Sequence, residues 1–319
     1  MADLLRARPS GPRRLRDLLE GADGPVLAPG AYDALGARLV EQAGFDCVYM
    51  TGFGTAAGLL GRPDIGLLTQ SEMLDNARRL SAAVDLPLIA DADTGYGNPL
   101  NVIRTVQDYE RAGIAGLHLE DQVMPKRCGH MTGKQVVPSG EMVAKLHAAA
   151  AARTDPDLLL IARTDARAPH GLDDALQRAR AYREAGADML FVEALEGVEE
   201  IELVARELAD VPLLFNWVEG GRTPPLPYEQ LAELGFALVI FPIGALLAAT
   251  AAVQRYLAAV QRAGSPLPVL DELPGFDTFL DVIGLAEIGR LEQRYAPRDD
   301  TAARPIPEPA RSPLSPRPG

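Results

Sequence analysis

The stretch Arg111–Asp121 (RAGIAGLHLED) contains the pattern that decides the fold. It opens with the charged end of a helix-like segment and with Gly113, which suits the left-handed residue that commonly follows a helix. The apolar run Gly116–Leu119 comes next and has the length of a buried strand. Glu120 and Asp121 follow it. The stretch therefore predicts a passage from a helix into a strand, with acidic side chains where the strand ends.

This pattern recurs along the chain. Short apolar runs, each followed by polar residues and a helix-period stretch, predict strands at Val26–Ala28, Cys47–Met50, Leu86–Ala90, Gly116–Leu119, Leu158–Ala162, Met189–Val192, Leu213–Phe215 and Leu238–Phe241. Strict alternation of strands and helices indicates a parallel sheet, and eight such units close into a (β/α)8 TIM barrel. An open doubly wound sheet is the alternative, although no glycine-rich phosphate loop follows the first run.

The two ends of the chain differ from this central part. Residues 1–20 carry several arginines and no apolar signal core, so we expect a solvated N-terminal arm, with a transit-like role left open. Residues 21–295 are predicted to form the barrel and a C-terminal helical extension. Its two helical stretches are Leu246–Arg262 and Phe276–Tyr295. Residues 296–319 are rich in Pro, Arg and Ser and are predicted to be a disordered tail.

Composition narrows the classes of partner. The 319 residues are 47% hydrophobic and contain no apolar run of bilayer length, so we expect a soluble globular protein. A net charge of −13 argues against nucleic acid and membrane partners, and a small anionic substrate would need local positive charge or a metal. Cys47 and Cys128 cannot build a disulfide framework and suit the reducing cytoplasm.

Acidic residues at strand ends indicate a metal site. Asp91 and Asp93 lie two apart after the third run, on what we expect to be an extended segment, and Glu120 follows the fourth. Carboxylates without a His or Cys partner are typical ligands of a hard cation such as Mg²⁺, which Mn²⁺ could replace. Asp64 could join them through a water molecule. The alternative is that these aspartates only form turns.

The segment Asp121–Pro138 is long for a barrel loop and contains Lys126–His130 (KRCGH). Long loops in compact domains are often lids or catalytic segments. The neighbouring basic residues are expected to lower the pKa of the Cys128 thiol, and Gly129 lets the backbone turn closely around it. Cys128 is therefore a candidate for proton transfer or attack. A basic surface turn with an incidental cysteine is the alternative, and Cys47 is predicted to be core.

Other strands also end in polar residues. Arg163 could bind a carboxylate with its planar guanidinium group, or pair with Glu193, and the two roles are compatible. His118 lies inside the fourth run, where a hydrogen-bonded core histidine is at least as plausible as a ligand. Tyr49 and Asn216 end the second and seventh runs.

Four motifs together resemble the isocitrate lyase/phosphoenolpyruvate mutase superfamily, over residues Pro29 to Tyr295. They are Asp91–Asn98 (DADTGYGN), Glu120-Asp121-Gln122, Lys126–His130 and Ala162–Ala166 (ARTDA). The resemblance implies a barrel whose last helix is exchanged between subunits, in a homotetramer built as a dimer of dimers, and Mg²⁺ near the carboxylates named above. It implies substrate binding by Thr51, Gly52, Phe53, Lys126, Gly129, His130, Asn216 and Thr223. The predicted catalytic residues are Cys128, Tyr49, Arg163 and Glu193.

The cysteine loop resembles that of 2-methylisocitrate lyase. This implies cleavage of a small 2-hydroxy di- or tricarboxylate to an α-keto acid and a carboxylate, with Tyr49 as candidate base and Cys128 as the acid that protonates the carbanion. Two features depart from that enzyme. Phe53 stands where its family has small residues and should shrink the pocket. The segment 216–224 (NWVEGGRTP) is closer to dimethylmalate-lyase-like proteins and to carboxyphosphonoenolpyruvate phosphonomutase, which forms P–C bonds.

Three functions remain open at this point. A lyase is favoured, because lyase chemistry is the commoner one for this loop. A phosphonomutase is the alternative, and its substrate would be a phosphonate rather than a carboxylate alone. A non-catalytic barrel should have lost a metal ligand or the cysteine, and the sequence keeps both.

Overall fold

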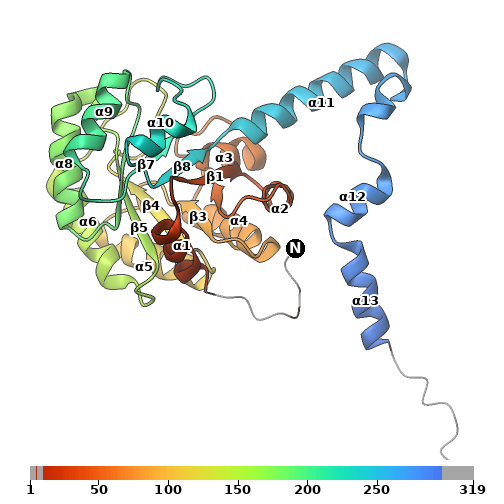
Figure 1. Cartoon of the computed structure of the whole chain (residues 1–319), viewed down its shortest axis with the longest axis horizontal. Helices are drawn as coiled ribbons and strands as arrows, with labels where there is room; N and C mark the ends of the chain where they lie inside the picture. Colours follow the sequence, from red (N-terminus) through yellow and green to blue (C-terminus); the bar gives the residue numbers. More distant parts are fainter. Residues whose placement is uncertain (1–4, 6–9, 297–319) are drawn as a thin grey trace, which may run out of the picture.

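The computed structural model describes Leu5 and residues 10–296, and its centre is a barrel of parallel strands (Figure 1). The strands are β1 (Val26–Ala31), β2 (Val48–Met50), β3 (Leu88–Asp91), β4 (Gly116–Glu120), β5 (Leu159–Thr164), β6 (Met189–Val192), β7 (Leu214–Asn216) and β8 (Leu238–Phe241). Their order is β6-β5-β4-β3-β2-β1-β8-β7. A parallel bridge between Leu190 and Leu213 joins the two edges. The predicted (β/α)8 barrel is confirmed, and each predicted run overlaps its strand.

Helices alternate with the strands and surround them (Figure 1). They are α2 (Ala34–Gln42), α3 (Gly52–Leu60), α4 (Gln70–Ala83), α5 (Pro99–Arg111), α6 (Ser139–Ala152), α7 (Arg167–His170), α8 (Leu172–Glu184), α9 (Val198–Glu207) and α10 (Tyr228–Glu233). Gly113, which follows α5, has φ 80°, and Gly186, after α8, has φ 104°. Gly113 is thus the left-handed helix end that the sequence predicts, and Gly186 ends α8 in the same way.

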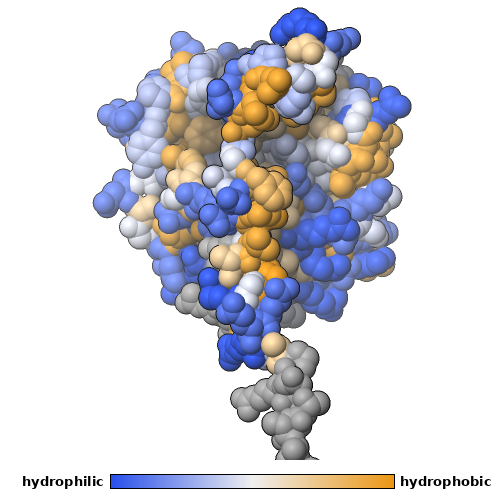
Figure 2. All heavy atoms as spheres, turned by 90° about the vertical axis from the view of Figure 1, so that its right-hand side faces the viewer, coloured by the Kyte–Doolittle hydropathy of each residue, from blue (hydrophilic) through white to orange (hydrophobic). Residues whose placement is uncertain are grey.

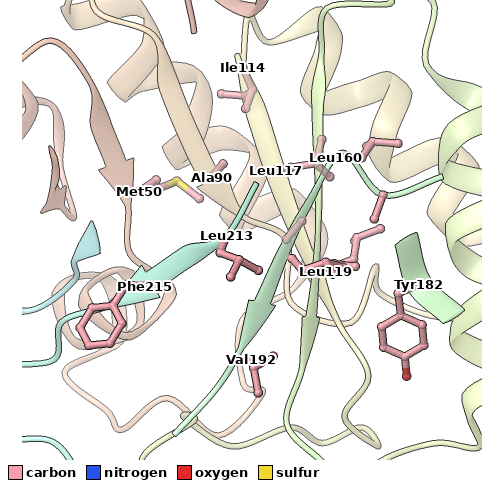
Figure 3. Packing of buried hydrophobic residues seen from close by; sticks show 14 of the residues in the cluster. Met50, Ala90, Ile114, Leu117, Leu119, Leu160, Tyr182, Val192, Leu213 and Phe215 are labelled. Carbon is pink, nitrogen blue, oxygen red and sulfur yellow. The ribbon is translucent and has the colours of Figure 1, made fainter. Parts of the chain in front are cut away.

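The strands are buried on both faces, so the core has two parts. Inward-facing residues such as Ile89, Ile161 and Phe191 fill the inside of the barrel. Outward-facing residues such as Leu117 and Leu160 pack between the strands and the surrounding helices, as Figure 3 shows. Burial on both faces is typical of parallel sheets and explains why the strands are continuous apolar runs.

The N-terminal arm is a correction to the sequence analysis. Residues Gly11–Gly21 form helix α1, and Leu15 on it is fully buried among the residues inside the barrel. Arg14 donates a hydrogen bond to the backbone oxygen of Asp85, and Arg16 Nε donates to that of Asp157 at 2.9 Å. These carbonyls precede strands, so α1 closes the N-terminal end of the barrel. The arginines bind backbone oxygens there. The number of arginines in this segment could not reveal these contacts.

The chain continues beyond β8 as a helical extension. Helix α11 (Gly244–Ala263) extends away from the barrel and is followed by η1 (Leu267–Glu272), α12 (Phe276–Val282) and α13 (Leu285–Tyr295) (Figure 1). The single predicted stretch Phe276–Tyr295 is thus two helices, separated at Gly284 with φ 85°. Apolar side chains along the extension are exposed. Figure 2 shows them, because its view faces the side of the molecule that carries the extension.

The predicted disordered tail lies outside the described residues, apart from Ala296. Within the described part of the chain, no helix has both the length and the apolar character to cross a membrane.

Candidate active site

A cavity of about 210 Å³ opens at the C-terminal ends of the strands, where barrel enzymes carry their active sites. The predicted site residues that line it are Tyr49, Thr51, Gly52, Phe53, Asp64, Asp91, Cys128, Gly129, His130, Arg163, Glu193 and Asn216. Sequence reasoning missed the lining residues Met131, Val218, Glu219, Gly220, Gly221, Pro242 and Ile243. These last residues come from the loops after β4, β7 and β8. Except for Glu219 they are apolar or glycine, so they gave no signal of chemistry, and Glu219 stands outside the strand ends from which the site was predicted.

The loop after β4 carries Cys128 over the cavity. Its two ends pair with each other, because Val123 N donates to Gln135 O and Val137 N donates to Asp121 O, both at 2.8 Å. Nearer the tip, Cys128 N donates to Asp64 O at 3.0 Å. The loop is therefore attached to the barrel both at its base and beside the cysteine.

The predicted low pKa of the Cys128 thiol is wrong. Burial raises its pKa to about 11, an effect that a hydrogen bond from the His130 backbone only partly offsets. Lys126, the nearest lysine in sequence, pairs with the carboxylates of Asp64 and Asp93 instead. A thiol that keeps its proton at neutral pH suits an acid better than a nucleophile.

We expect alkylation to report this raised pKa directly. The rate at which iodoacetamide modifies Cys128 should rise with pH up to about 11, because the thiolate is the reactive form. A short cysteine peptide should reach its plateau about two pH units lower, near the ordinary thiol pKa. Mass spectrometry of the Cys128 peptide between pH 7 and 11 measures both rates. A plateau already reached at pH 9 would contradict the raised pKa.

A buried cluster lies beneath the cysteine loop. Lys126 Nζ lies 2.7 Å from both Asp64 Oδ2 and Asp93 Oδ1. The predicted substrate-binding role of Lys126 is therefore not supported, since its charge is engaged by two carboxylates and it does not line the cavity. Asp93 has φ 47°, so it is not extended as expected. Its backbone N–H donates to Asp91 Oδ1 at 2.9 Å, which turns the chain back on itself.

Asp91 faces the cavity from the end of β3. A Cβ atom at Gly52 would lie 2.2 Å from Asp91 Oδ2, so glycine is needed for the helix α3 to approach this carboxylate. Glu120 lies below, fully buried, and neither of its carboxylate oxygens has a hydrogen-bond partner. Burial raises the pKa of Glu120 well above its ordinary value, although Arg163 and Lys126 oppose the shift.

These carboxylates fit a hydrated cation better than a directly ligated one. Within the described residues, no three His, Cys, Asp or Glu side chains form a group that could hold a metal ion. Mg²⁺ often binds through one or two carboxylates and keeps several waters. Asp91, Asp64, Asp93 and Glu120 supply only oxygen ligands. The Glu120 oxygens accept no hydrogen bond from the protein, so they could accept one from bound water.

Arg163 and Glu193 form an ion-pair network beside this cluster, and Arg163 Nη1 lies 3.5 Å from Glu120 Oε2. Arg163 donates two hydrogen bonds to Asp165, at 2.9 and 3.1 Å, and its Nη2 lies 3.4 Å from Glu193 Oε2. His130 Nε2 lies 3.0 Å from Glu193 Oε1, and Asn216 donates to Oε2 at 3.0 Å. Burial raises the pKa of Glu193, but Arg163 and His130 outweigh it and the pKa falls. Glu193 therefore stays ionised and positions its neighbours.

Tyr49 is poorly suited to the predicted role of base. Its hydroxyl lies 2.8 Å from His118 Nε2. Burial, followed by the charge of Asp91, raises the pKa of Tyr49 well above its ordinary value, so the phenolate is disfavoured. Burial also lowers the pKa of His118 to about 4, which leaves a neutral, hydrogen-bonded core histidine.

Two further predicted residues, Thr223 and Cys47, and the neighbouring Trp217 can be placed. Thr223 does not line this cavity; it lines an adjoining apolar crevice with Leu190 and Phe236, and Asn216 lines both. Trp217 also lies outside the lining, and its indole N–H donates to Leu226 O at 3.0 Å. Cys47 is fully buried inside the barrel, and the prediction that it is core is confirmed.

The start of helix α3 provides positive character at the cavity wall. Thr51 caps the helix by accepting from Gly54 N at 3.1 Å. Gly52 and Phe53 are the first residues of the helix and line the cavity, and N–H groups in a first turn have no partner within their own helix. Such a helix end commonly binds a carboxylate or phosphate group.

A barrel whose strands end in polar residues around a small cavity has the architecture of a barrel enzyme. The chain belongs to the phosphoenolpyruvate phosphomutase family, whose model matches residues 15–261, and hence to the isocitrate lyase/PEP mutase superfamily. It is 46% identical to 2,3-dimethylmalate lyase of Eubacterium barkeri, over 89% of this chain and 97% of that protein.

Two other relatives carry different activities. The chain is 44% identical to the chloroplastic carboxyvinyl-carboxyphosphonate phosphorylmutase of Arabidopsis thaliana, over 89% of this chain and 84% of that protein. The structure of oxaloacetate acetylhydrolase with the inhibitor 3,3-difluorooxalacetate superposes with a TM-score of 0.86 at 39% identity, covering 90% of this chain and 98% of that one. The names of these relatives denote different reactions within one superfamily.

Proposed function

We propose that this protein is a Mg²⁺-dependent carbon–carbon lyase that cleaves a small 2-hydroxy dicarboxylate, a 2-alkylated malate such as 2,3-dimethylmalate. The observation that carries the proposal is the two-sided cavity. Asp91, Arg163 and the start of α3 form a polar wall, and Val218, Pro242 and Ile243 are among the apolar lining residues. A volume of about 210 Å³ is below that of pockets for drug-sized ligands, which favours a substrate of a few carbons.

The protein's own groups can orient such a substrate. The N–H groups of Gly52 and Phe53 would bind one carboxylate. Arg163 would stabilise negative charge at the other end, because its side chain lines the cavity while Asp165 holds the guanidinium group in place. Alkyl substituents would contact the apolar side chains. A hydroxyl group placed there would lose its hydrogen bonds to water without gaining new ones.

Mg²⁺, or Mn²⁺ in its place, would be held by Asp91 and Asp64, with Asp93 and Glu120 bound through water. When bound, such a cation polarises the oxygens of a 2-hydroxy acid and stabilises negative charge on them. Lys126 balances the remaining charge of Asp64 and Asp93.

Cys128 would complete the reaction as the acid. Cleavage of the bond between C2 and C3 leaves the electron pair on C3, next to the carboxylate, while C2 becomes the carbonyl carbon of an α-keto acid. The hydroxyl proton passes to a solvent water molecule, the thiol of Cys128 protonates C3, and the resulting thiolate regains a proton from solvent. The raised pKa of Cys128 keeps this proton in place until the carbanion forms.

The charge of the cavity favours a lyase over a phosphonomutase. Of the described residues that line it, Asp64, Asp91, Glu193 and Glu219 are acidic, and Arg163 is the one with a permanent positive charge. A substrate that carries a phosphonate as well as carboxylates would meet more repulsion here than a dicarboxylate would. The phosphonomutase therefore remains the second candidate.

The test is incubation of the purified protein with Mg²⁺ and 2,3-dimethylmalate, 2-methylisocitrate, isocitrate and other 2-substituted malates. Pyruvate or glyoxylate is detected as the keto acid, and EDTA treatment is the control for the metal. We expect pyruvate from 2,3-dimethylmalate, lost with EDTA and restored by Mg²⁺. If no carbon–carbon substrate yields a keto acid, the lyase proposal fails and P–C chemistry takes its place.

Phe53 is expected to select against larger substrates. Phe53→Ala should raise kcat/KM for 2-methylisocitrate relative to 2,3-dimethylmalate by about tenfold or more, since a lost or gained apolar contact in a pocket changes discrimination by that order. Steady-state kinetics with both substrates measures the ratio. Phe45→Ala serves as the control, because Phe45 does not line the cavity. An unchanged ratio in Phe53→Ala would exclude this residue as a determinant of size.

We also propose a homotetramer in the cytoplasm. The two free thiols, which form no disulfide, suit the reducing cytoplasm.

The exposed apolar side chains of the C-terminal extension support the tetramer, because they could be buried against other copies of the chain; they include Leu257, Phe276, Phe279 and Leu285. Light scattering of the full chain measures the mass in solution, and a monomer would overturn the oligomeric proposal.

A further inference from the structure

Lys134 lies on the cysteine loop but is buried, with 1% of its side chain exposed. Its Nζ donates to Gly129 O at 2.6 Å and to Asp165 Oδ1 at 2.7 Å. Burying an ammonium group is costly unless hydrogen bonds and an opposite charge compensate for it. Lys134 does not line the cavity, so the proposed reaction does not explain why its charge is buried.

The two partners of Lys134 belong to different parts of the site. Asp165 follows β5 and accepts both hydrogen bonds from Arg163. Gly129 is the neighbour of Cys128 and lies directly on the ion pair of Arg163 and Glu193. A Cβ atom at Gly129 would lie 2.4 Å from Arg163 Nη2 and 2.5 Å from Glu193 Cδ. The loop therefore meets the barrel at Gly129, and Lys134 connects that point to Asp165.

We propose that Lys134 is a positioning residue that fastens the cysteine loop to the Arg163–Asp165 pair and so places the Cys128 thiol over the cavity. One ammonium group joins the loop backbone beside the thiol to the barrel, in addition to the paired base of the loop and the hydrogen bond from Cys128 N to Asp64 O. The functional consequence rests on the proposed role of Cys128 as acid. The attachment itself does not depend on that role and can be tested without substrate.

The two cysteines of the chain allow the attachment to be measured. Cys128 reports release of the loop, whereas Cys47, fully buried inside the barrel, reports unfolding of the whole protein. We expect Lys134→Met to increase the rate of iodoacetamide modification of Cys128 by about tenfold or more at constant pH, because the thiol loses its cover. Cys47 should stay protected. Lys134→Arg, which keeps the charge, should restore much of the protection.

Lys145→Met is the matched control. Lys145 is also buried, but it lies on α6 and donates to Thr94 O at 3.2 Å, away from the loop tip. Its loss should leave the Cys128 rate unchanged relative to Cys47. If Lys134→Met exposes both cysteines, the same comparison is made with Lys134→Gln, whose amide can still donate to one partner. The proposal is overturned if Cys128 in Lys134→Met reacts at the wild-type rate while Cys47 stays protected. It is also overturned if Cys128 reacts equally fast in Lys134→Arg and Lys134→Met.

Kinetics separates this proposal from the proposed function. With 2,3-dimethylmalate, Lys134→Met should lower kcat by about tenfold or more with a smaller change in KM, because the thiol is displaced while the carboxylate-binding groups remain. If the wild-type protein has no lyase activity, the proposed function fails, but the labelling result still decides whether Lys134 holds the loop.

Discussion

Cys128→Ser is expected to lower kcat for keto acid formation by about 10²–10⁴-fold, the range by which a positioned general acid accelerates a reaction. Serine has nearly the same size, but its hydroxyl is a far weaker acid than a thiol and would protonate the carbanion slowly. KM should change little, because the carboxylate-binding wall is formed by other residues. Steady-state kinetics of the purified variant with 2,3-dimethylmalate measures both constants.

Cys47→Ala is the control for this experiment. Cys47 is buried inside the barrel, away from the cavity lining, so its replacement should leave kcat within about twofold while removing the other thiol. Activity of Cys128→Ser within a factor of ten of wild type would show that another group protonates the product.

The pH profile of kcat offers a second check. Because the pKa of Cys128 is raised to about 11, the acid should keep its proton from neutral pH up to that value.

Asp165→Asn should lower the free energy of unfolding by about 3–5 kcal/mol, since removing one partner from a buried charge network leaves the others uncompensated. Asp165 is fully buried and pairs with both Arg163 and Lys134. Asparagine keeps the shape, so the loss reflects charge rather than a cavity. Urea unfolding followed by circular dichroism measures it. Asp75→Asn is the control, because its ion pair with Arg79 is exposed and contributes little.

The pH dependence of this loss has a definite sign. Burial raises the pKa of Asp165, but Arg163 and Lys134 outweigh burial and the pKa lies below its ordinary value of 3.8. A depressed pKa in the folded state means that the stabilisation is fully present above 3.8 and is lost as the pH falls further. The difference between wild type and Asp165→Asn should therefore be constant from pH 7 to about 5 and shrink in stronger acid. A loss below about 1 kcal/mol at pH 7 would contradict the network.

The sequence by itself determined the barrel, because the signals for it are local. An apolar run has the length of a strand whatever surrounds it, and a residue such as Gly113 ends a helix through its own backbone freedom. Local order also placed polar groups such as Asp91 and Arg163 at strand ends. In a parallel barrel all these ends meet at one mouth, so most of the cavity lining followed from the order of the chain.

The tertiary structure decided what depends on packing between distant segments. Leu15 marks α1 as the closing helix of the barrel, although its neighbours in sequence are arginines. Lys126 is next but one to Cys128 in sequence, yet its charge goes to Asp64 and Asp93, and burial then raises the thiol pKa that adjacent charges were expected to lower. Lys134 gave no signal at all, because its role exists only where the loop meets Asp165. Periodicity and spacing report on the backbone of one segment, whereas the direction of a charged side chain and the water removed around it are set by the segments packed against it.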